Sequence, residues 1–104
     1  MKEAREGVFG ALADPVRRSL LMNLAEGPRT ATQFARSYPM SRQGIIKHLN
    51  VLYNAGLVTT RKNGRDVEYE LKPEPLGDVS KFVKKLEAKW DERLMRLKTM
   101  LENE

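Results

Sequence analysis

The 104-residue chain contains no cysteine, a single histidine and no apolar run that approaches the length of a membrane span. Without cysteine there is no disulfide, no thiolate metal site and no thiol redox switch. The lone histidine has no partner of its own type with which to form a metal or catalytic site. The N-terminus also lacks the apolar segment of a signal peptide, so a cytoplasmic protein without a cofactor is the default expectation.

The basic residues are concentrated in one part of the chain. The net charge is +5, from 19 lysines and arginines against 14 acidic residues. Residues 27–65 contain seven lysines and arginines and not one acid, whereas residues 74–104 carry seven residues of each sign. An acid-free segment of that length makes a positive surface, which attracts polyanions. Nucleic acid is the favoured partner, while an acidic protein surface or an anionic membrane stays open.

Proline and glycine divide the N-terminal part of the chain into helices. Apolar residues at helical spacing predict a first helix over 3–13. Asp14-Pro15 then supplies an N-cap and a first-turn proline for a second helix. Gly27-Pro28 ends that helix, because glycine suits the left-handed residue after a helix and proline cannot continue it.

Two further capping signals predict a third and a fourth helix. Thr30 and Gln33 fit a capping box, which predicts a short third helix that runs to about residue 37. Ser41 is the expected N-cap of a fourth helix that ends near Gly56. The buried side of this fourth helix is expected to carry Ile45, Leu49 and Leu52.

A β-hairpin and a long helix complete the chain. Residues 57–62 are rich in β-branched side chains, and residues 67–72 alternate between apolar and polar. Asn63-Gly64 lies between them and is the strongest short hairpin signal. The segment from about 76 to 102 keeps a helical apolar stripe throughout and would span ~40 Å as one helix.

This order of elements predicts a winged helix-turn-helix, mainly α with a two-stranded β wing. Two short helices joined by a tight turn form a helix-turn-helix when the second is basic and capped. A hairpin with a cationic tip directly after them is a wing, and the combination binds DNA. We expect one domain over 1–104, with the helix-turn-helix at 30–55, the wing at 57–72 and dimerisation helices at 1–13 and 76–103.

The outward side of the helix over 41–55 is the predicted DNA-reading surface. Its first turns would enter the major groove, where arginine can bind guanine, glutamine can bind adenine and an apolar side chain can contact a thymine methyl. The wing and the start of the third helix would contact phosphate or the minor groove. A glycine in the first turn would allow close approach to DNA. The candidate residues are Thr30, Thr32, Ser41, Arg42, Gln43, Gly44, Ile46, Lys47, His48, Asn50, Arg61, Lys62, Asn63, Gly64 and Arg65.

Several candidates have a structural alternative. Ile46 either contacts a thymine methyl or packs at the edge of the core. His48 either packs at the edge of the helix interface or meets phosphate. The charges of the wing could also serve to discourage strand pairing at an exposed edge, and both roles can hold at once. The polar residues of the recognition helix could be ordinary surface groups.

The last helix is too long for one small domain to cover. Pairing with the same helix of a second chain would bury its stripe by two-fold symmetry, with the first helix as neighbour. The alternative is a helix that folds back on its own domain. The candidate dimer residues are Val8, Phe9, Val79, Phe82, Val83, Leu86, Trp90, Leu94, Leu97 and Leu101.

Four stretches resemble the ArsR family of bacterial transcriptional repressors. They are ALADPVRR at 11–18, MSRQ with KHL at 40–49, VLYNAGLV at 51–58, and the wing RKNGR at 61–65 with its strand ending in YEL. The resemblance implies a homodimer that binds a palindromic operator and represses transcription, often of its own operon. It maps the family's base contacts onto Arg42, Gln43, Ile46 and Lys47.

Two departures from the family pattern accompany the resemblance. Ile46 stands where serine is usual, and Gly44 stands where alanine or threonine is commoner. Many members sense metals through cysteines or through histidine and acidic clusters in the last helix. This chain has neither cysteine nor a histidine in that helix, and therefore resembles the members that do not sense metal.

Two other classes of function can be weighed against DNA binding. A winged helix can also act as a protein-interaction module, here for an acidic partner, and such a module would not bind DNA. An enzyme has no support, because no pair of acids lies within a basic segment and one histidine stands alone. The effector, if there is one, is not indicated by the sequence.

Overall fold

The chain folds into a compact helical part and one projecting helix. The structure, a computed structural model, describes residues 2–103 and the side chains of residues 7–103, so that Met1 and Glu104 of the expected domain lie outside the described residues. Within this range the order is α1 (Lys2–Leu12), α2 (Pro15–Leu24), β1 (Arg29–Thr30), α3 (Ala31–Ser37), α4 (Arg42–Asn54), β2 (Val58–Asn63), β3 (Asp66–Leu71) and α5 (Leu76–Glu102).

The core lies where α1 to α4 meet the sheet. Ile45, Leu49 and Leu52 have no exposed surface, which confirms the predicted buried side of α4. Around them pack further fully or almost fully buried side chains from the other elements, among them Val8, Ala11, Leu20, Leu24, Phe34, Leu57, Val58 and Tyr69. Of α5, only the first turn contributes, through the partly buried Leu76 and Val79.

The predicted two-stranded wing is present as β2 and β3, and a third strand that the sequence did not predict extends it to a sheet in the order β1-β3-β2. Arg29 pairs with Tyr69 and Thr30 with Glu68, which adds β1 to the free edge of β3. A strand of two residues is too short to show any alternation, so the sequence held no signal for it.

The wing turn differs in detail from the predicted one. Asn63 pairs with Asp66 as the last strand pair, so the two loop residues are Gly64 and Arg65. Gly64 has φ +66°, and no non-glycine residue among those described has a positive φ. Glycine in the first loop position with positive φ is what a type II′ turn requires. Gly64 therefore sets the register of the wing.

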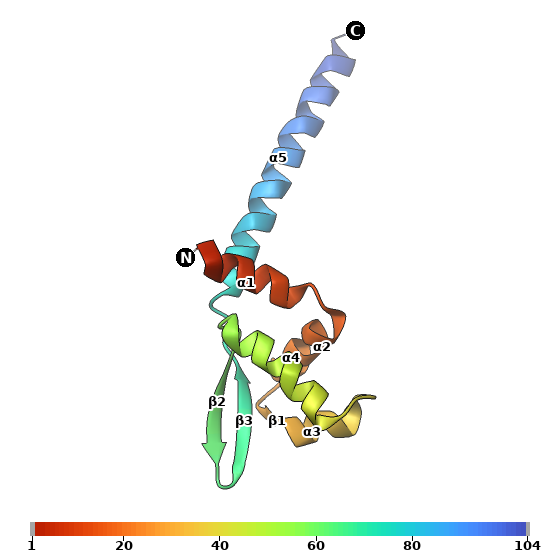
Figure 1. Ribbon diagram of the computed structural model, residues 1–104. Helices are drawn as coiled ribbons and strands as arrows, with labels where there is room; N and C mark the ends of the chain where they lie inside the picture. The colour runs from red at the N-terminus through yellow and green to blue at the C-terminus, as the bar shows by residue number, and fades with distance from the viewer. Residues whose placement is uncertain (1, 104) are drawn as a thin grey trace.

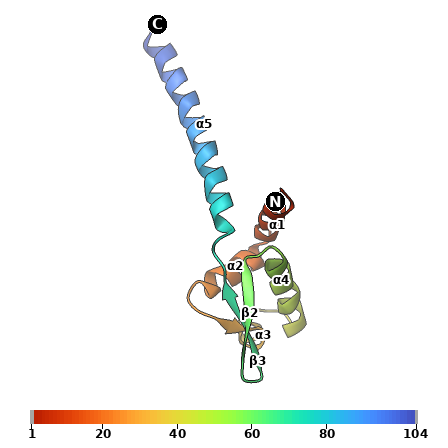
Figure 2. The ribbon, with the colours of Figure 1, turned by 90° about the vertical axis from the view of Figure 1, so that its left-hand side faces the viewer.

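The molecule is elongated because α5 stands apart from the rest of the chain. Figures 1 and 2 show α5 projecting alone, with the wing at the opposite end of the molecule and α1 near the base of α5. The extents are 71 × 30 × 21 Å and the radius of gyration is 19.0 Å, against ~13 Å for a compact chain of about 100 residues.

Two arginines at the start of α2 cap the end of α1. Arg17 donates from Nε to the Ala11 carbonyl at 2.8 Å and from Nη2 to the Gly10 carbonyl at 3.2 Å. Arg18 Nη1 donates to the Leu12 carbonyl at 2.8 Å. The last carbonyls of a helix lack the N–H partners of the helix interior, and here only that of Gly10 also accepts a backbone N–H among the described contacts, from Ala13 at 3.2 Å. A cation beside these carbonyls also suits the helix dipole. The two arginines thereby fix α1 against α2.

Asp14 caps α2 in the way that the sequence predicted. Its carboxylate accepts the Arg17 backbone N–H at 3.0 Å. This hydrogen bond is the main cause that lowers the pKa of Asp14 below its usual value, and the nearby charge of Arg17 acts in the same direction. The charged carboxylate is therefore favoured in the folded state.

The lowered pKa of Asp14 predicts a loss of stability in acid. The charged cap stabilises the fold above the usual pKa of 3.8, and this contribution disappears as the pH falls through the lower pKa of the folded state. Asparagine caps a helix about as well without a charge. We expect the difference in unfolding free energy between wild type and Asp14→Asn, measured by urea titration, to shrink between about pH 5 and about pH 2. A difference that stays constant over this range would contradict the assignment.

Candidate nucleic-acid interface

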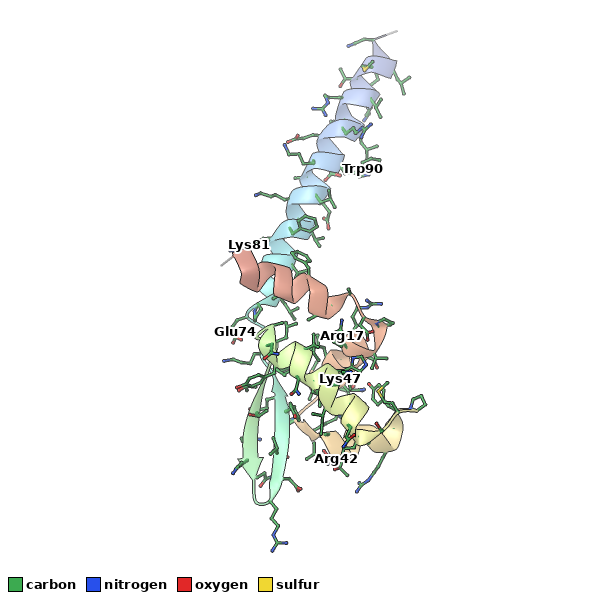
Figure 3. The ribbon with its side chains drawn as sticks, viewed as in Figure 1. Arg17, Arg42, Lys47, Glu74, Lys81 and Trp90 are labelled. Carbon is green, nitrogen blue, oxygen red and sulfur yellow. The ribbon has the colours of Figure 1, made fainter. Side chains whose placement is uncertain are left out.

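Helix α4 presents a polar side to solvent, opposite its buried side. Ser41 begins the helix as predicted, and its hydroxyl accepts the Gly44 backbone N–H at 3.1 Å. Figure 3 shows Arg42 near the start of α4, beside α3, and Lys47 further along the helix. The exposed residues that share this side are Arg42, Gln43, Lys47 and Asn50. All four side chains are exposed to solvent on one side of α4.

The start of α3 is held by the predicted capping box. Thr30 Oγ1 accepts the Gln33 backbone N–H at 3.1 Å, and Gln33 Oε1 accepts the Thr30 backbone N–H at 2.8 Å. Thr32 lies in the first turn of α3, and its Oγ1 accepts a hydrogen bond from Arg42 Nε at 3.1 Å. Both candidate threonines of α3 therefore have a defined partner in the folded chain.

Ile46 lies at the edge of the core. It is partly buried and packs against the buried cluster, which matches the second of its two alternatives. Its remaining surface lines a groove of about 200 Å³ between α4, the start of α3 and the wing. The groove is lined by Thr30, Ala31, Thr32, Arg42, Ile46, Arg65, Asp66, Val67 and Tyr69. Ile46 thus packs against the core with one part of its side chain and lines the groove beside Arg42 with the other.

His48 faces its own chain. Its Nδ1 lies 3.4 Å from Arg17 Nη1 and 3.9 Å from the Asp14 carboxylate. These contacts join α4 to the start of α2, and they correspond to the structural alternative for this residue. Figure 3 shows Arg17 on the α2 side of α4.

The two faces of the wing carry different charges. Because side chains alternate along a strand, Lys62 shares a face with its cross-strand partner Val67 and with the buried Tyr69, and this face turns towards α4. Arg61 lies on the other face, 3.3 Å from Glu68 and 3.3 Å from Glu70. In the free chain the charge of Arg61 is therefore balanced inside the wing, and its contact with phosphate stays a prediction. The tip residues Asn63, Gly64 and Arg65 are exposed.

The dimer candidates fall into two groups. Val8 is only 2% exposed and belongs to the core of its own chain, so its surface is not available to a partner. Val79 is partly buried there as well. Phe9 is 39% exposed and its ring meets Phe82 edge to face at a centroid distance of 5.4 Å. The other candidates form an exposed apolar stripe along α5: Phe82, Val83, Leu86, Trp90, Leu94, Leu97 and Leu101.

Some residues that hold the helices together are not marked by any local sequence pattern. The Tyr38 hydroxyl lies 2.7 Å from Ser19 Oγ and accepts a hydrogen bond from Asn23 Nδ2 at 2.8 Å, which ties the turn before α4 to α2. In the sequence, only the family resemblance points to Arg17 and Arg18. Their partners are backbone carbonyls six or seven residues away, which no side-chain pattern reveals.

Among the described residues, no three histidine, cysteine or acidic side chains come together as a metal ion would require. None of the described helices has the length and hydropathy needed to cross a bilayer.

Comparison with known proteins agrees with this geometry. A family model described as a helix-turn-helix domain matches residues 12–61. The HTH-type transcriptional regulator Rv2034 of Mycobacterium tuberculosis is 40% identical over 76 residues, which cover 69% of this chain and 71% of the relative. The transcriptional repressor SdpR of Bacillus subtilis is 35% identical over 71 residues, or 68% and 79% of the two chains.

A solved structure extends the similarity to almost the whole chain. The ArsR-like transcriptional regulator from Rhodococcus sp. RHA1 superposes with a TM-score of 0.83 at 34% identity, over 98% of this chain and 94% of that one. The similarity therefore includes α5 as well as the helix-turn-helix and the wing.

Gly44 provides a test of the idea that a missing side chain allows close approach to DNA. A Cβ at this position would lie 3.4 Å from Ser41 Oγ and 3.8 Å from Met40, in ordinary contact with its own chain. We expect Gly44→Ala to raise the unfolding free energy by about 0.5 kcal/mol, since alanine is the better helix former, and to leave operator affinity unchanged. Gly64→Ala is the control, because φ is positive there and the change should destabilise. A selective loss of affinity in Gly44→Ala, measured by fluorescence anisotropy, would contradict this expectation and support the close-approach role.

Proposed function

The chain belongs to the ArsR family of winged helix-turn-helix transcriptional regulators, and from this we propose that it is a homodimeric repressor that binds a palindromic operator. It is a DNA-binding regulator and not an enzyme. The name of SdpR, a transcriptional repressor, supports repression. Control of its own operon is part of the proposal, as is action in the cytoplasm.

The observation that carries the proposed mode of binding is the accessible side of α4. Arg42 and Gln43 occupy its first turn, where a recognition helix meets base edges in the major groove. Arginine can donate two hydrogen bonds to guanine, and glutamine can pair in the same way with adenine. Lys47 would contact a base or a phosphate. We assign the sequence-reading contacts to these residues.

The wing would hold the neighbouring backbone. Lys62 is exposed on the face that turns towards α4, and Arg65 is exposed at the tip and lines the groove beside Arg42. Neither makes an ion pair with any of the described residues. Their charge is thus available to phosphate or to a narrow minor groove, where arginine is favoured. Arg61, balanced by two glutamates, is left out of this set.

The uncovered surface of α5 supports the homodimer. The chain exposes 7998 Å², against about 6,000 Å² for a compact protein of this mass. The excess per chain is comparable to what a stable interface buries in total. The apolar stripe of α5, continued by Phe9, offers a self-complementary surface to a second copy, and two recognition helices would then meet half-sites whose centres lie ~34 Å apart.

Variants of α4 should change the sequence specificity of DNA binding, whereas variants of the wing should change its affinity for all sequences. We expect Arg42→Ala to cost ~1–3 kcal/mol of binding and to relax specificity at one base pair, because a bidentate contact is lost. We expect Lys62→Ala to weaken binding evenly across sequences and to reduce the slope of log affinity against log salt by about 1. Titration of selected and scrambled duplexes at several salt concentrations measures both. No preference of the wild type for any duplex would contradict the proposed function.

The proposed dimer predicts different effects for two charged substitutions, one in the stripe of α5 and one away from it. Leu86→Glu places a charge in the stripe of α5, where Leu86 is 59% exposed, and should yield monomers with at least about tenfold weaker operator binding, since the two half-sites lose their linkage. Met22→Glu is the matched control, because Met22 is 73% exposed on α2, away from the stripe. Light scattering at micromolar concentration gives the mass, and a monomeric wild type would refute the dimer.

A further inference from the structure

Thr32 projects from a rigid point of the fold. Its neighbours Ala31 and Phe34 are 4% and 2% exposed and anchor α3 in the core. The capping box locks the start of the helix, and the strand pair of Thr30 with Glu68 ties it to the sheet. Its hydroxyl oxygen is therefore an acceptor carried on a segment of backbone that the core and the sheet hold in place.

Arg42 donates to this acceptor through one of its N–H groups and keeps the others available. The hydrogen bond to Thr32 Oγ1 engages Nε, and of the five N–H groups of a guanidinium the four on Nη1 and Nη2 remain. No carboxylate of the described residues lies within ion-pair distance of Arg42. The side chain is therefore oriented while its full charge and its bidentate edge stay available.

Arg61 shows the contrasting arrangement in the same molecule. It too is oriented by neighbours, but these are the carboxylates of Glu68 and Glu70, which neutralise it. A neutral hydroxyl orients without neutralising. An arginine that must afterwards bind an acceptor on a base needs the first kind of partner.

We propose that Thr32 is a positioning residue, which holds the Arg42 guanidinium in the orientation that reads a guanine. Helix α3 thus contributes to operator specificity without touching a base. The inference rests on the proposed function, in which Arg42 makes the base contact. Its physical basis is the conformational entropy that a long side chain loses when it becomes fixed. Here the side chain is already fixed in the folded protein, so this entropy is not lost on binding.

The test combines Thr32 and Arg42 variants of the full-length chain with duplexes that differ at single base pairs of the selected operator. Thr32→Val removes the hydroxyl at nearly constant shape, and Thr32→Ser restores it. We expect Thr32→Val to reduce discrimination at the base pair read by Arg42 by roughly two- to tenfold, the ordering cost of one long side chain. Thr32→Ser should keep most of the discrimination, and Thr99→Val on α5 is the matched control.

The decisive comparison uses the Arg42→Ala background. There Thr32→Val should have no further effect on discrimination, because the group that it orients is gone. An even loss of affinity for all duplexes would overturn the inference and indicate a phosphate contact or a change in folding. Persistence of the Thr32→Val effect without Arg42 would overturn it as well. A wild type without sequence preference would instead refute the proposed function and the inference together.

Discussion

The contact of Arg17 with both α1 and α4 is the constraint on which the rest of the structure depends. Its guanidinium binds the last carbonyls of α1 and lies beside His48 of α4. Three helices meet at this one planar group, whose donors point in fixed directions. The helix that would read DNA is thereby placed relative to α1, and α1 in turn meets α5 through the Phe9–Phe82 ring contact. A continuous chain of contacts joins the proposed dimer surface to the proposed DNA surface.

Stability and assembly are divided between two parts of the chain. The buried residues belong to α1–α4, the strands and the link before β2, while α5 buries none of its residues. Among the described residues, α5 beyond its first turns has its own backbone hydrogen bonds and one i,i+4 ion pair, Lys98–Glu102 at 4.0 Å, to stabilise it. Most helices in proteins depend on packing of an apolar face. The apolar stripe of α5 fits that requirement only when another surface covers it, which is why the dimer is central to the proposal.

The sequence predicted most of the fold because its signals were local. Caps at Asp14, Thr30 and Ser41, and the stripe over 76–102, depend on residues within a few positions of one another, and each was confirmed. What it missed depends on pairing across the chain. Arg61 looked like a free cation because its glutamate partners lie on the next strand, and β1 was too short to show a pattern. Val8 looked available to a partner because helical spacing alone does not say which chain covers a stripe.

The register of the wing decides which cations of the acid-free segment are left without an acidic neighbour. The acid-free residues 27–65 end at the turn before β3, and β3 pairs with β2. This pairing brings Glu68 and Glu70 against Arg61 and leaves Lys62 on the face turned to α4. A slip of one residue would exchange these faces, placing Lys62 beside the glutamates and Arg61 beside the groove. The register is held by the two-residue turn, which needs the positive φ of Gly64. A glycine without a side chain therefore decides which cation of the wing a DNA backbone would meet.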